Sequence, residues 1–142
     1  MTARGGVEAW LRAVRDLLLG FPIALFTSAM LTDIAYLKTA ELQWSNFSAW
    51  LITGALVAGA LALIAALIEV PAAIARGANG RNAMTCAIAL ALAWGLGLVN
   101  AFKHSQDGWS SVETFGMILS ILSTLLAIVA GLLAYAPEED AR

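Results

Sequence analysis

The sequence predicts an all-α membrane protein folded as an up-down bundle of four transmembrane helices. The chain holds four apolar runs of about twenty residues, and 61% of its 142 residues are hydrophobic while 13% are charged. A helix rises about 1.5 Å per residue, so about twenty residues cross a hydrocarbon core of roughly 30 Å. An average soluble domain is about 25% charged. This chain therefore has too little polar surface to coat a water-soluble protein.

Residues 1–16 are predicted to form a short interfacial helix ahead of the first span. The charged side chains lie on other faces of this helix. The apolar side chains recur at helical spacing and are Val7, Trp10, Leu11, Val14 and Leu18. Arginines followed by an apolar run also resemble a signal peptide. The apolar run continues to Leu37 with Pro22 in its middle, however, so we expect it to be retained as a span.

The four spans are predicted at about residues 17–37, 49–68, 83–102 and 116–136. Asp33 is the only acidic or basic side chain within them. The spans take up more than half of the chain and their connections are short, which favours antiparallel neighbours. We therefore expect residues 1–142 to form a single membrane domain.

Small residues repeat at helix-face spacing in the last three spans. Lipid offers no hydrophobic drive for association, so helices meet where small residues let their backbones approach. The predicted packing positions are Gly54, Ala58, Ala62, Gly95 and Gly131. These faces are expected to pack within the bundle, although the same pattern would also suit a partner subunit.

The orientation follows from the basic residues. All six arginines lie on the side of the N-terminus, the second connection and the C-terminal tail, whereas Lys38 and Lys103 lie on the other side. Positive residues favour the cytoplasm. We expect a multi-pass protein of the bacterial inner membrane with both termini in the cytoplasm.

Asp33 is the main candidate for a functional side chain, because a charge inside the hydrocarbon is costly and is by default functional. It lies about 24 Å along the first span from Leu17, near the outer end. Asn100 is at a similar depth, so the two are predicted to form a polar site. Asp33 is expected either to anchor the span, with water or Lys38 as its partner, or to line an outward-facing site.

Glu69 ends the second span on the cytoplasmic side. We expect it to form an ion pair with one of the nearby arginines, Arg15, Arg76 or Arg81. Asp33 and Glu69 lie at opposite ends of the bilayer, so they cannot form a catalytic carboxylate pair.

The remaining reactive side chains do not form a catalytic, metal or cofactor site. His104, the single histidine, is predicted to be solvated in a connection, and haem in a membrane bundle usually needs two axial ligands. Cys86, the single cysteine, is read as a packing residue. The net charge of -2 does not suggest nucleic acid. No enzymatic activity and no cofactor are therefore expected.

The run Phe21-Pro22-Ile23-Ala24-Leu25, followed by Asp33, Trp50 and Glu69, resembles a bacterial family of uncharacterised four-span membrane proteins, domain-of-unknown-function family 2231. Its members typically read His-Pro-Leu-Leu-Val-His ahead of the Phe-Pro step, whereas residues 15–20 here contain no histidine. A ligand or redox role of those histidines cannot be carried over. Relatives are sometimes joined to redox domains, which implies that the bundle acts as an anchor.

Three functions stay open at this point. The leading one is a non-catalytic anchor or accessory subunit of an inner-membrane assembly, with electron transfer as one candidate process. Its partners would be the lipid bilayer and either another membrane protein or a second copy. The alternatives are a small transporter or channel-like protein with an outward-facing site at Asp33 and Asn100, and a quinone- or haem-linked redox protein.

Overall fold

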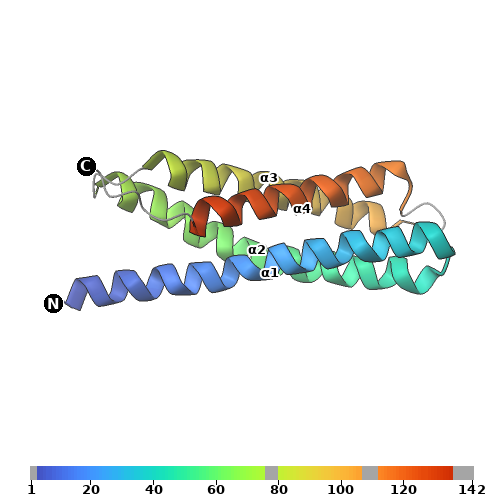
Figure 1. The fold of residues 1–142 in the computed structure, drawn as a ribbon, viewed down its shortest axis with the longest axis horizontal. Helices are drawn as coiled ribbons and strands as arrows, with labels where there is room; N and C mark the ends of the chain where they lie inside the picture. The colour runs from blue at the N-terminus through green and yellow to red at the C-terminus, as the bar shows by residue number, and fades with distance from the viewer. Residues whose placement is uncertain (1–2, 76–79, 107–111, 136–142) are drawn as a thin grey trace.

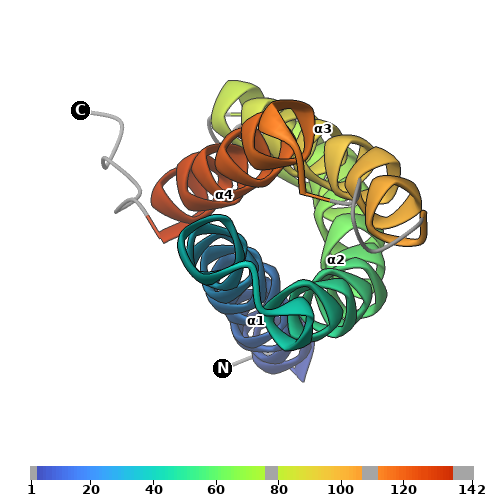
Figure 2. The ribbon, with the colours of Figure 1, turned by 90° about the vertical axis from the view of Figure 1, so that its right-hand side faces the viewer.

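Four long helices form the bundle in the computed structural model, which describes residues 3–75, 80–106 and 112–135. They are α1 (Ala3–Thr39), α2 (Leu42–Ala75), α3 (Gly80–His104) and α4 (Thr114–Tyr135). Seen along the bundle they form a ring, in which α1 packs on α2 and α4, and α3 packs on the same two helices (Figure 2). All four are long and apolar enough to cross a membrane. The predicted four-helix membrane fold is thus confirmed.

The bundle has two distinct ends (Figure 1). The α1–α2 turn, the end of α3 and the start of α4 lie at one end, which we call the hairpin end. The start of α1 and the end of α4 lie at the other, the terminal end. With 37 residues α1 is about 55 Å long, whereas α4 has 22 residues and is about 33 Å long. Residues 3–14 of α1, the α1 arm, therefore project beyond the end of α4.

The separate interfacial helix predicted for residues 1–16 is not found, because α1 runs without interruption from Ala3 to Thr39. No proline or turn residue separates the amphipathic start from the apolar run, so the helix continues through both. Pro22 lies inside α1, where neighbouring helices make such a proline tolerable. Its ring lies against α2, since a Cβ built on Gly59 would be 3.6 Å from the Pro22 Cβ.

The turn between α1 and α2 depends on Ala40. Its φ of 55° is left-handed, and its N–H donates to the Tyr36 carbonyl at 2.8 Å. Helices commonly end in this conformation, but usually with glycine, because a Cβ is crowded there. The tight turn brings α2 back alongside α1 after only two residues.

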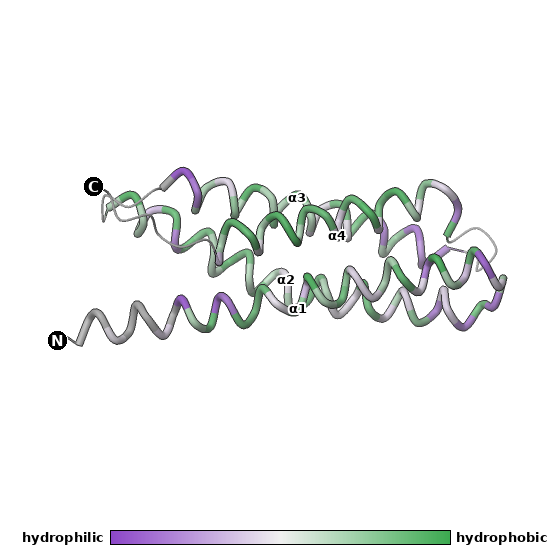
Figure 3. The backbone as a smooth tube through the Cα atoms, viewed as in Figure 1, coloured by the Kyte–Doolittle hydropathy of each residue, from purple (hydrophilic) through white to green (hydrophobic). Residues whose placement is uncertain are grey.

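The core is divided along the bundle. A middle layer of Phe26, Ile52, Ala55, Ala93 and Ala127 is wholly apolar. The buried residues on its terminal side are apolar too, whereas all nine buried polar residues of the described chain lie on its hairpin side: Thr32, Asp33, Ser45, Ser48, Asn100, His104, Ser120, Ser123 and Thr124. Figure 3 shows that mostly hydrophobic residues occupy the middle of the bundle and that hydrophilic residues are more frequent toward its two ends. We call these two parts the hairpin half and the terminal half.

The predicted packing positions on α2 and α4 lie at or near helix contacts. Ala62 is fully buried, and a Cβ on Gly131 would come within 2.6 Å of Ile23 Cδ1. Gly54 and Ala58 line an apolar groove between α1 and α2.

On α3 the close approach falls on a different glycine from the predicted one. A Cβ built on Gly95 would have no neighbour within 4 Å, whereas one built on Gly97 would lie 2.5 Å from the ring of Phe26. The two glycines differ by two residues and so point to different sides of the helix. The position of the Phe26 ring, rather than the repeat of small residues, therefore determines that a glycine is required at position 97 and not at position 95.

Candidate functional site

Four buried side chains from three helices meet in the hairpin half. Asp33 comes from the last third of α1 and Ser120 from the second turn of α4. Asn100 and His104 come from the end of α3, where their spacing of four residues puts them on one face. We call these four residues the polar ring. Asp33 and Asn100 have no exposed surface.

Hydrogen bonds join the polar ring into a closed circuit. The Asn100 side-chain amide donates to Ser120 Oγ at 2.8 Å, and the Ser120 hydroxyl donates to Asp33 Oδ2. The other carboxyl oxygen of Asp33 lies 2.9 Å from His104 Nε2. His104 Nδ1 lies 3.0 Å from the backbone carbonyl of Asn100, which closes the circuit. Helices α1, α3 and α4 are thereby tied together at one depth.

The circuit determines where the protons of the imidazole lie. A backbone carbonyl can only accept, so His104 Nδ1 must carry the proton that it donates to Asn100. The contact between Nε2 and Asp33 Oδ1 then holds one proton. Whether this proton is on nitrogen, as an ion pair, or on oxygen, as a neutral pair, the two groups together carry no net charge. A neutral unit avoids the cost of burying an uncompensated charge.

The structure corrects the prediction for His104. It is the last residue of α3, and its side chain is fully buried against Asp33 rather than solvated. The prediction treated it as part of a connection, because the apolar run ends two residues earlier. Its spacing of four from Asn100, at the depth of Asp33, is the signal that would have found it.

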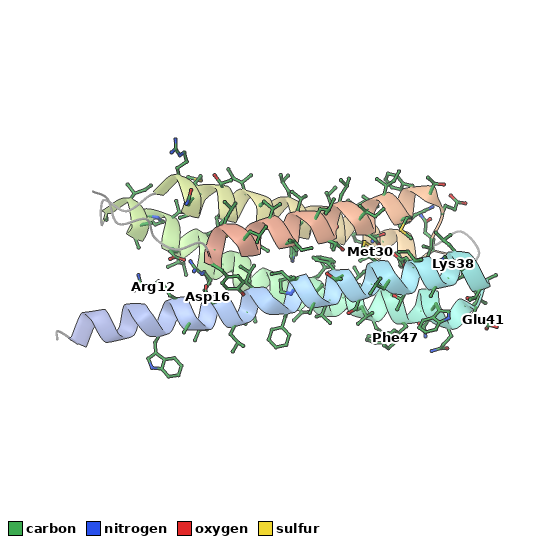
Figure 4. All side chains as sticks on the ribbon, in the orientation of Figure 1. Arg12, Asp16, Met30, Lys38, Glu41 and Phe47 are labelled. Carbon is green, nitrogen blue, oxygen red and sulfur yellow. The ribbon has the colours of Figure 1, made fainter. Side chains whose placement is uncertain are left out.

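Asp33 and Asn100 belong to the same cluster, as their depths suggest, but Ser120 lies between them. The hydroxyl accepts from Asn100 and donates to Asp33. Lys38, the other partner considered for Asp33, is exposed at the hairpin end, near Glu41 (Figure 4). Ser120 was absent from the predicted site, since a serine in an apolar run is also an ordinary helix-packing residue.

The other buried polar atoms of the hairpin half include one that forms a hydrogen bond and three that form none with the described residues. Ser48 donates to the carbonyl of Ala29 on the neighbouring helix at 3.2 Å. Asn100 Oδ1, Ser123 Oγ and Thr124 Oγ1 are buried and have no hydrogen-bond partner within the described part of the chain. The half of the bundle that holds the ionisable pair thus also holds buried polar atoms with unused hydrogen-bonding capacity.

A second polar cluster closes the terminal end. Arg15 forms an ion pair with Glu69 of α2, and it also contacts Asp16 at 2.6 Å and the carbonyl of Ala134 at 3.4 Å. The Tyr135 hydroxyl donates to the Asp16 carbonyl at 2.6 Å. These contacts tie α1 to α2 and α4. Figure 4 shows Arg12 and Asp16 at this end.

Arg76 and Arg81, the other two predicted partners of Glu69, are not shown in contact with it. Arg76 lies outside the described residues. Arg81 is exposed at the start of α3. The arginine that contacts Glu69 is therefore the one on α1, 54 positions away in the sequence.

Within the described residues, no three His, Cys, Asp or Glu side chains gather as a metal site. Cys86 is buried in the terminal half and lies 3.4 Å from the carbonyl of Ala130. The chemistry available at the polar ring is therefore that of one carboxyl group, one imidazole and the hydroxyls beside them.

A family model described as a predicted membrane protein (DUF2231) matches residues 16–135. It therefore covers the polar ring, Glu69 and all four spans, and it begins after the α1 arm. Searches of curated proteins and of solved structures each give no match to this chain.

Proposed function

We propose that this chain, which belongs to the DUF2231 family of predicted membrane proteins, is a non-catalytic anchor or accessory subunit of an assembly in the bacterial inner membrane. It is an integral membrane protein with four spanning helices.

The α1 arm is the observation that carries this proposal. It extends as a helix past the end of α4, and Trp10 on it is 74% exposed. Tryptophan is enriched among the residues that contribute most binding energy in protein interfaces. With both termini in the cytoplasm, as the arginine distribution indicates, the arm would meet a partner at the cytoplasmic face of the membrane.

The interior of the bundle fits a supporting role as well. Both oxygens of Asp33 and both ring nitrogens of His104 are used in contacts within the chain. At the other end, Arg15 is used in the same way. These clusters hold the helices in register, which a rigid anchor requires.

A site-specific crosslinking experiment tests the anchor. A photoreactive residue is placed at position 10 of the full chain in native membranes, and a matched one at position 50, because Trp50 is 70% exposed on α2 near the hairpin end. We expect position 10 to crosslink one defined membrane protein and position 50 to crosslink lipid. Deleting residues 3–14 should release the chain from the assembly. A chain that migrates alone, with lipid adducts at both positions, would contradict the proposal.

The orientation is tested separately. A reporter fused after Arg142 should report the cytoplasm, and one inserted at Gln43 should report the outer side. Reversed signals would move the α1 arm to the outer face and exclude a cytoplasmic partner.

Transport is the second candidate, and the ionisable pair in the polar hairpin half favours it. Intramembrane carboxylates and histidines commonly line ion or proton pathways. The variant Asp33→Asn keeps the size of the side chain and removes its charge. A well-folded Asp33→Asn protein that fails to complement a deletion strain would favour transport, whereas full complementation would favour the anchor.

A further inference from the structure

We propose that Asp33 and His104 form a proton-binding site inside the bundle, which exchanges one proton with water at the hairpin end. This inference goes beyond the anchor function and does not depend on it. It rests on the circuit of hydrogen bonds, on the burial of the pair and on its position near one end of the helices.

The circuit leaves one exchangeable proton. His104 Nδ1 keeps its proton because the Asn100 carbonyl can only accept it, at 3.0 Å. The proton between Nε2 and Asp33 Oδ1 is held by two basic atoms 2.9 Å apart. When it passes to water, the imidazole is left neutral and the carboxyl group is left as a carboxylate. The pair then changes from no net charge to one negative charge.

The surroundings can respond to that change. The Ser120 hydroxyl already donates to Oδ2 and would stabilise the carboxylate. The hydroxyls of Ser123 and Thr124, three and four residues further along α4 than Ser120, are buried without a partner in the described chain and add polar groups to the same half. An apolar core would lack such groups, and there a buried charge costs more.

The position of the pair makes exchange with one side of the membrane possible. His104 is the last residue of α3, and Ser105 and Gln106 beyond it are exposed. Asp33 lies six residues, or about 9 Å, before the end of α1. Toward the terminal half, the apolar middle layer around Phe26 separates the pair from the other end. We therefore expect protons to enter and leave at the hairpin end.

Among the described residues, the charged groups nearest to this end come from two helices and two connections. They are Lys38 on α1, beyond the half-buried Tyr36, Glu41 in the first connection, Lys103 on α3, and Glu113 in the connection ahead of α4. Helix α2 faces this half with the uncharged Ser45 and Ser48. Lys103 lies 3.8 Å from Glu113, so these two charges offset each other. The pair itself remains the only buried ionisable group in the described hairpin half.

Nuclear magnetic resonance tests the site directly, because His104 is the single histidine of the chain. The full chain, labelled with ¹⁵N-histidine in nanodiscs, gives only two ring resonances. Across the pH range in which the protein stays folded, we expect Nδ1 to remain protonated. The Nε2 resonance should shift as the pH rises, because the proton that Nε2 shares with Asp33 Oδ1 is lost. An Nε2 resonance that does not move, or an Nδ1 that loses its proton first, would overturn the proposal.

Two variants show whether the effect belongs to the pair. In Asp33→Asn the Nε2 resonance should leave the wild-type pH curve, because an amide cannot share that proton. Ser48→Ala removes another buried hydroxyl of the same half that lies outside the polar ring, and it should keep the wild-type curve. An unchanged curve in Asp33→Asn, or an equal displacement in Ser48→Ala, would overturn the proposal. Since the wild-type titration is decisive by itself, a poorly folding variant leaves the test intact.

Discussion

The hairpin half and the terminal half are built from the same four helices, yet they bury different chemistry. The hairpin half contains every buried polar residue of the described chain, and the terminal half buries only apolar residues. Both halves nevertheless contain charged clusters that tie α1 to α4. The difference between them lies in how each cluster avoids the cost of a charge in a membrane.

In the terminal half the charges stay near the rim. The side chains of Arg15 and Glu69 are 13% and 19% exposed, so both retain contact with their surroundings. With Asp16 the cluster has one positive and two negative groups. In the hairpin half the Asp33 and His104 side chains have no exposure, and there the single shared proton keeps the pair neutral. The Asp33–His104 pair is thus fully buried because its charges cancel. The terminal cluster, whose charges do not cancel, stays partly exposed.

The largest test of this contrast removes one carboxylate from each half. Asp33→Ala strips buried partners from both His104 and Ser120, and we expect it to lower the free energy of unfolding by about 3–5 kcal/mol. Glu69→Ala leaves Arg15 with Asp16 and the Ala134 carbonyl, so the loss should be smaller, about 1–2 kcal/mol. Unfolding in mixed micelles measures both. Equal losses would mean that burial does not distinguish the two clusters.

A smaller effect is expected at the layer that separates the halves. Gly97→Ala drives a Cβ into the ring of Phe26 and should cost about 1–3 kcal/mol through overpacking. Gly95→Ala, two residues away, meets open space and should gain up to about 1 kcal/mol from helix propensity. The thermal stabilities of the Gly97→Ala and Gly95→Ala variants are compared by unfolding in detergent. If Gly97→Ala were as stable as Gly95→Ala, the close packing of this layer would be refuted.

The smallest effect is expected at the turn of the hairpin end. Ala40 has a left-handed φ of 55°, and Ala40→Gly removes its crowded Cβ. We expect a gain of up to about 1 kcal/mol, because the relief exceeds the greater freedom of glycine in the unfolded chain. Ala24→Gly, at an exposed position inside α1, should instead lose about 1 kcal/mol. A loss in both variants would show that the turn is not strained.

The presence of four helices that can span a membrane was decided by the sequence alone, whereas their limits were not, since α1 includes the predicted interfacial helix and α2 extends beyond the predicted residues 49–68 at both ends. A backbone in hydrocarbon must satisfy its own hydrogen bonds, so an apolar run of about twenty residues has few alternatives to a helix. Helical rise then sets the depth of each side chain. This is why Asp33 and Asn100 could be placed at one level, and why Glu69 could be given an arginine partner at the opposite end.

Only the tertiary structure decided which side chains meet. The spans are apolar on nearly every face, so the sequence does not reveal how each helix is rotated about its own axis. That rotation places Gly97, rather than Gly95, against Phe26. It also turns His104 and Ser120 toward Asp33 and closes a circuit between residues 87 positions apart. Depth is a property of one helix, whereas facing is a property of the packed bundle, because it depends on how all the side chains of the neighbouring helices fit together.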